Sequence, residues 1–131
     1  MLSRNKTKTI IALLFLAIII AGGIWEMIYV KRVFDELDGR LDALLTSVIA
    51  EDSPTSMGKT EELAEWWEQK KCVLEHLAFS ADLRAMSVAI GEVKGSLYKE
   101  DFMNAASKVT SLFAISQNLR ELMCFDSKDI I

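Results

Sequence analysis

A run without charged residues near the N-terminus constrains this chain more than any other part of the sequence. Residues 9–25 contain no charged side chain, and three basic residues stand in the positions before them. Extended to Val30, the run contains Glu26 as its one charge and matches the length of about 20 residues that a helix needs to cross a bilayer. The sequence therefore predicts a transmembrane anchor over residues 9–30, preceded by a basic cytoplasmic tail over residues 1–8.

A cleaved signal peptide is the alternative interpretation of this segment. The small residues at positions 21–23 are of the kind that a signal peptidase accepts. The apolar pattern continues beyond them, however, and Trp25 and Tyr29 stand where membrane proteins place aromatic residues at the lipid interface. We therefore expect a retained anchor in the lipid bilayer of the cell membrane.

The charge distribution bears on orientation and on partners. Basic residues before the anchor favour a cytoplasmic N-terminus and an extracytoplasmic C-terminal part, although Lys31, Arg32 and Arg40 after the anchor leave the opposite orientation open. From residue 31 onward the chain holds 12 of the 15 basic and 18 of the 19 acidic residues, a net charge of 12 − 18 = −6. A nucleic-acid partner is therefore not expected, since phosphate binding needs a basic surface.

The composition favours an all-α fold. The chain of 131 residues contains only one proline and six glycines, which permits long uninterrupted helices. The roughly 100 residues that follow the anchor are enough for one small domain. We expect an N-terminal transmembrane helix that continues into a small three-helix bundle containing an antiparallel helical hairpin.

After the anchor, apolar residues recur at alternating spacings of four and three, which is the pattern of a heptad repeat. They are Val30, Phe34, Leu37, Leu41, Leu44 and Val48. The pattern predicts a stalk helix over residues 31–51 that continues the membrane helix outward. Two interpretations stay open: the helix packs on its own chain, or it forms a weak homodimer as a coiled coil, with Phe34, Leu37 and Leu41 as candidate interface residues.

Two helices are predicted beyond the stalk. Residues 52–59 contain the only proline together with serine, threonine and glycine, and therefore predict a linker. A helical hairpin is predicted over residues 60–124, with Thr60 as its N-cap and a turn that begins at Gly95. Within the first of these helices the apolar stripe changes face, which predicts either burial on two sides or a kink near residues 80–82.

Trp66 and Trp67, followed by Lys70 and Lys71, form the densest group of aromatic and basic residues. Adjacent residues on a helix point about 100° apart, so we expect one tryptophan in the core and the other near the surface. An exposed tryptophan suits a partner interface or the aromatic wall of a ligand groove, which makes both residues candidates for an interface. Burial of both side chains beneath the C-terminal tail is the alternative.

No group of residues predicts a reaction, a cofactor or a metal site. His76 is the only histidine and lies one helical turn after Cys72, but two ligands do not complete a tetrahedral zinc site. Neither residue has the orienting partner that nucleophilic catalysis needs. We therefore expect a protein that is not an enzyme, with no catalytic, cofactor-binding or metal-binding residue.

The two cysteines are a candidate disulfide. In an antiparallel hairpin that turns between Gly95 and Lys99, Cys72 and Cys124 lie at matching distances from the turn and face each other. Outside the cytoplasm such a pair can form a disulfide if its Cα atoms lie within about 7 Å. Two reduced, half-buried cysteines are the alternative.

Two sequence segments carry a resemblance to a known family. They are W-W-E-Q-K-K-C-V-L-E-H at residues 66–76 and K-E-D-F-M-N-A-A at residues 99–106. Together with the layout of the whole chain, they resemble a family of short single-pass membrane proteins from clostridia-like Gram-positive bacteria whose domain has no known function. The resemblance implies an architecture and no activity, and the sequence departs from it at residues 124–127, where the tail of residues 125–131 begins.

These features favour an interaction or structural module held at the outer face of the membrane, with an envelope or membrane protein as its partner. A sensor-like ligand-binding helical bundle is the alternative. A sensor that passes a signal across the membrane needs a second membrane helix, and no other apolar run in the sequence approaches that length. The sequence therefore favours the interaction module.

Overall fold

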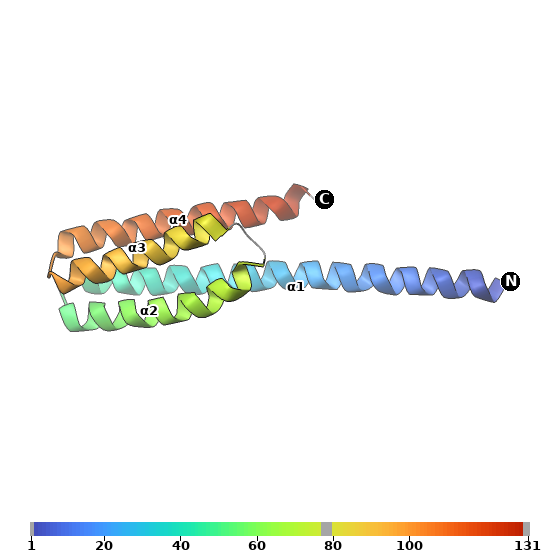
Figure 1. Cartoon of the computed structure of the whole chain (residues 1–131), viewed down its shortest axis with the longest axis horizontal. Coiled ribbons are helices and arrows are strands. Elements are labelled where there is room, and N and C mark those ends of the chain that lie inside the picture. The colour runs from blue at the N-terminus through green and yellow to red at the C-terminus, as the bar shows by residue number, and fades with distance from the viewer. Residues whose placement is uncertain (1, 77–79, 130–131) are drawn as a thin grey trace.

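The computed structural model describes residues 2–76 and 80–129, with side chains described for residues 4–76 and 81–123. The described residues form four α-helices and no β-strand (Figure 1). The helices are α1 (Leu2–Ile49), α2 (Ser53–Leu74), α3 (Ser80–Tyr98) and α4 (Phe102–Asp129). The predicted all-α fold is confirmed.

All four helices contribute to one bundle, in which successive helices run antiparallel (Figure 1). α1 packs against α2 and α4, and α3 packs against the same two helices. The described residues make no close backbone contact between α1 and α3 or between α2 and α4, so the helices occupy the corners of a square. The α1–α2 and α3–α4 turns lie at one end of the bundle, and the break between α2 and α3 lies at the other.

The predicted three-helix bundle is wrong, because the helix predicted to start at Thr60 and run to Lys94 is in fact two helices. α2 ends at Leu74 and α3 begins at Ser80. The buried residues of the two segments would lie on different faces of one straight helix, and the interruption turns both faces toward the same core. The kink predicted near residues 80–82 is therefore observed as a full break, slightly earlier in the chain.

α1 is one continuous helix with two different surroundings. Its 48 residues span about 72 Å at 1.5 Å per residue. Beyond its basic first turns, the first half is apolar on all sides and exposed, as the 68% exposure of Ile18 illustrates, and burial begins at Val30. In the described part of the chain, α1 contains the one stretch that is long and apolar enough to cross a membrane. The predicted continuation of the apolar segment into the stalk helix is confirmed.

The linker predicted over residues 52–59 is wrong, because these residues form the first turns of α2. Asp52 is the N-cap, and its side chain accepts a hydrogen bond from a backbone N–H of the first turn at 3.2 Å. Pro54 also lies in the first turn, where a missing N–H removes no helical hydrogen bond. Thr60, predicted as the N-cap, is instead buried inside the helix, and its hydroxyl donates to a carbonyl oxygen one turn earlier at 2.7 Å.

The turns after α1 and α3 have the same geometry. Glu51 and Glu100 adopt left-handed backbone conformations, with φ of 56° and 57°. In each turn the N–H of this glutamate bonds the carbonyl three residues earlier, and the next N–H bonds the carbonyl five residues earlier, which is the Schellman motif. The aspartates that follow, Asp52 and Asp101, cap the next helices. Gly95, predicted as the helix end, lies inside α3.

The two hairpins of the bundle are related by a shift of 49 residues along the sequence. The shift carries Glu51 onto Glu100 and the α1–α2 turn onto the α3–α4 turn. It also aligns the buried positions of α1 with those of α3. The aligned buried pairs are Phe34 with Leu83, Leu37 with Met86, Leu41 with Ile90, Leu44 with Val93 and Val48 with Leu97. Each hairpin therefore presents the same pattern to the shared core.

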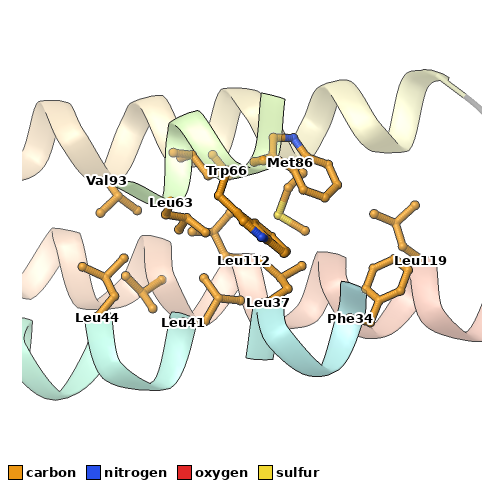
Figure 2. Close-up of a cluster of buried hydrophobic side chains, with 14 of the residues drawn as sticks. Phe34, Leu37, Leu41, Leu44, Leu63, Trp66, Met86, Val93, Leu112 and Leu119 are labelled. Atoms are coloured by element: carbon orange, nitrogen blue, oxygen red, sulfur yellow. The ribbon is translucent and has the colours of Figure 1, made fainter. Parts of the chain in front are cut away.

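The core lies between the four helices and receives large apolar side chains from each of them. All six predicted heptad positions of α1 are buried. Figure 2 shows Leu37 and Leu41 of α1 pointing into the same cluster as Leu63 of α2 and Leu112 of α4. The stalk helix is thus one wall of the bundle, and its apolar stripe is covered by α2, α3 and α4.

Candidate functional site

The predicted seam residues of α1 lie inside the bundle. Phe34, Leu37 and Leu41 are fully buried and belong to the core (Figure 2). This arrangement is the alternative in which the helix packs on its own chain. The three side chains have no surface for a partner while the bundle is folded, so the structure corrects the expectation that they form an accessible interface.

The tryptophan pair is also buried. Trp67 is fully enclosed, and its Nε1 donates a hydrogen bond to the Ser87 hydroxyl of α3 at 3.0 Å. Trp66 is 8% exposed and lies under the Arg40 guanidinium of α1, 5.1 Å from the ring centroid. One tryptophan thus fills the core and the other lies nearer the surface, as predicted, but neither forms an exposed aromatic wall. The C-terminal tail proposed as their cover lies outside the described side chains.

A polar network between α1 and α4 was not predicted from the sequence. One Arg120 nitrogen lies 3.0 Å from a carboxylate oxygen of Asp35 and 3.0 Å from one of Asp38. The buried Ser116 hydroxyl donates to the other oxygen of Asp38 at 3.2 Å. The only sequence signal for this network is a serine, Ser116, with an arginine, Arg120, one helical turn later. The network fixes the register of α4 against α1.

Cys72 and Cys124, the candidate disulfide, do not lie in one hairpin as predicted. Cys72 lies on α2 and Cys124 lies on α4. These helices occupy opposite corners of the bundle, since each packs against α1 and α3. Cys72 is exposed. The side chain of Cys124 lies outside the described residues, so the bond itself stays a prediction that alkylation and mass measurement would test.

The end of α2 carries the residues that come closest to a chemical site. His76 is exposed, as is Cys72 one turn before it. Within the described ranges, no three histidine, cysteine, aspartate or glutamate side chains gather as a metal ion requires. This part of the molecule therefore provides no geometry from which a reaction or a metal site can be argued.

Aromatic residues mark the level at which α1 enters the bundle. Trp25 and Tyr29 stack with their ring centroids 5.4 Å apart. The Lys70 ammonium of α2 lies 5.8 Å from the Tyr29 ring centroid. An aromatic pair beside a lysine is typical of the lipid–water interface, where rings sit among headgroups and long cationic side chains reach water.

A shallow groove runs along the outer surface between α3 and α4. It has a volume of about 420 Å³ and is open to solvent. Its apolar floor includes Ala85, Val88 and Ile115, and the ion pair between Lys108 and Glu92 lies at its edge, with the charged atoms 2.6 Å apart. The groove is large enough for a small ligand but does not enclose one.

No family model, curated protein or solved structure matches this chain. The resemblance to the single-pass proteins of clostridia-like bacteria therefore stays a prediction. The surfaces of the bundle and the apolar segment of α1 are the features that bear on function.

Proposed function

We propose that this protein is a helical interaction or structural module, anchored in the cell membrane by the first half of α1, with its bundle on the extracytoplasmic side. One observation carries the proposal: α1 passes without a break from an exposed apolar segment into the core of the bundle. A helix that is apolar all round needs apolar surroundings, which a bilayer supplies. A continuous helix would fix the height and the axis of the bundle relative to the membrane.

The contacts between helices favour a scaffold. Lys94 of α3 pairs with Glu61 of α2 at 3.9 Å, and Arg120 of α4 pairs with two aspartates of α1. Every buried side-chain nitrogen or oxygen in the described residues has a hydrogen-bond partner. The described residues therefore contain no buried, unpaired polar side chain that could bind a substrate. This is compatible with a rigid support for a partner protein.

A sensor-like ligand-binding bundle is the second candidate, and the groove between α3 and α4 is the observation that favours it. An apolar floor with one ion pair at its edge suits a small amphipathic ligand. The groove is open, however, and lies on the outside of the bundle, so a ligand there would touch two helices and leave the packing of α1 unchanged.

Two measurements test the proposal. A reporter that is active only outside the cytoplasm, fused after Ile131, is expected to be active, and a cytoplasmic reporter at the same position is expected to be silent. The reverse pattern would overturn the orientation. Crosslinking in cells, followed by purification of the full chain, is expected to retain a neighbouring envelope or membrane protein, and the same procedure without crosslinker provides the control.

A further inference from the structure

The end of the bundle farthest from the apolar segment exposes large apolar side chains. We define the distal tip as residues 49–54 and 98–103, which are the two turns and the adjoining helix ends (Figure 1). Ile49 is 69% exposed, Tyr98 is 85% exposed and Met103 is 86% exposed. The remaining exposed large apolar residues on the described bundle are less exposed and lie on other faces. They are Val73, Val88 and Leu122.

The distal tip is built twice from equivalent positions. The shift of 49 residues that relates the hairpins carries Ile49 onto Tyr98 and the exposed Pro54 onto Met103. Each turn therefore presents one exposed apolar residue before the reversal and one after it. The two turns lie at the same end of the bundle (Figure 1), so the exposed apolar residues of both hairpins gather at that end. Exposed apolar residues gathered on one part of a folded domain are typical of a docking site.

Acidic residues lie in the same two turns as these apolar residues. Glu51, Asp52, Glu100 and Asp101 are exposed in the two turns, against a single base, Lys99. None of these four carboxylates forms a salt bridge with the described part of the chain. The tip therefore carries a local excess of negative charge that no described basic side chain pairs with, although Asp52 and Asp101 also cap α2 and α4.

The two glutamates occupy a backbone conformation that glycine adopts at lower free energy. Both have positive φ and close a Schellman motif, where glycine is the usual residue. Neither side chain forms a hydrogen bond or ion pair within the described residues that would account for the choice. Unfavourable backbone conformations of this kind are found more often at functional sites than elsewhere.

We propose that the distal tip is the docking surface for a partner protein segment that carries apolar side chains flanked by lysine or arginine. The inference rests on the proposed function and names the surface and the chemistry of its partner. Apolar side chains of the partner would cover Ile49, Tyr98 and Met103, and its cations would pair with the carboxylates of Glu51 and Glu100. Such pairing sets specificity and association rate, and the apolar contact supplies affinity.

Charge and distance exclude two other occupants. The tip lies about 30 Å beyond Val30, where burial begins, which places it outside the headgroup layer of the anchoring membrane. A second membrane whose surface carries anionic lipids would repel it. A second copy of this chain docking tip to tip would bring two acidic rims together. A basic protein segment is the occupant that the charge of the tip fits.

Site-specific photo-crosslinking of the full chain in its native membrane tests this inference. A benzophenone amino acid at Tyr98 is expected to give one discrete protein adduct, whose crosslinked peptide is apolar and rich in lysine or arginine. The double change Glu51→Lys and Glu100→Lys should lower the yield by roughly tenfold or more, because like charges then face each other. Glu62→Lys and Glu65→Lys, at exposed positions on the side of α2, are the matched control and should leave the yield unchanged.

The outcomes separate this inference from the proposed function. The probe placed at Val88, on the side of α3, reports on other contacts of the bundle. Adducts from Val88 alone would contradict docking at the distal tip but would still support an interaction module. No adduct from either position would count against the docking surface and against the proposed function. A lipid adduct, an adduct with a second copy, or a yield from Tyr98 that ignores the charge reversal would also overturn the tip. Ile49→Ala with Met103→Ala, with the probe kept at position 98, provides a second loss-of-contact variant without a charge change and should also lower the yield.

Discussion

The two halves of α1 are both rich in apolar residues, yet the first half is exposed and the second half is part of the core. In the first half, residues such as Phe15 and Ile18 are exposed around the whole circumference. In the second half the apolar residues follow one stripe and are covered by the other three helices, while the opposite face is polar. The comparison teaches that the distribution of apolar residues around a helix, more than their number, determines whether it needs lipid or protein around it.

The largest expected effect is a loss of stability caused by a substitution in the buried half of α1. Leu41→Asp places a carboxylate at a fully buried position, and we expect it to lower the free energy of unfolding by more than about 4 kcal/mol. Circular dichroism during thermal unfolding in detergent measures the loss, and the protein should stay in the membrane fraction. Ala43→Asp, on the exposed face of the same helix, is the matched control, and an equal loss there would contradict the comparison.

The converse change acts on the exposed half. Ile18→Asp places a charge near the middle of the apolar segment, where it disfavours membrane insertion by about 2.5 to 3.5 kcal/mol. We expect a smaller fraction of the protein to resist extraction from membranes at alkaline pH, with the thermal unfolding of the bundle unchanged. Unfolding at a lower temperature would mean that the first half of α1 belongs to the folded domain.

A smaller effect is expected from the tryptophan pair. Trp67→Phe removes the hydrogen bond to the Ser87 hydroxyl and part of the ring volume, which should destabilise the bundle by about 1 to 3 kcal/mol. Trp66→Phe keeps an aromatic ring beneath Arg40 at the edge of the core and should cost less than half of that. Denaturant unfolding of both variants in parallel checks the order, and a larger loss at Trp66 would contradict it.

The smallest effect has the opposite sign and compares the two turns. Glu51→Gly and Glu100→Gly each relieve a left-handed backbone conformation, and each should stabilise the bundle by up to about 1 kcal/mol. The melting temperature should rise by a similar amount for both variants, since the turns have the same geometry. A fall in melting temperature for either variant would show that the glutamate side chain stabilises its turn.

The sequence was sufficient where the pattern was local and long. The uncharged run and the heptad spacing after it predict one continuous helix, which α1 confirms. The turns were misplaced because their residues are not the usual ones: Pro54 was interpreted as a linker residue, and Gly95 was preferred to Glu100 as the helix end. A glutamate with positive φ gives no signal in the sequence, since the Schellman hydrogen bonds and the helix that follows determine it.

The surfaces were harder to predict than the fold. Trp66 and Phe34 are large apolar residues and were predicted as candidate interface residues. The bundle buries both. Burial depends on which helices face each other. The facing of the helices depends in turn on where α2 ends and α3 begins, and the spacing of the apolar residues does not determine that position. Tyr98 and Met103, which are left exposed, lie at the end of α3 and the start of α4, where no periodic pattern marks them as core or surface.

The central claim is that one unbroken helix joins the apolar segment to the core of the bundle. Spin labels at Ala17 and Ile49, both exposed on α1, test it most directly by pulsed dipolar spectroscopy in lipid nanodiscs, after Cys72 and Cys124 are changed to serine. An unbroken helix predicts a single narrow distance distribution centred near about 48 Å, from about 32 residues at 1.5 Å each. A broad distribution, or one centred below about 40 Å, would mean that α1 bends or unwinds between membrane and bundle, and would contradict the claim.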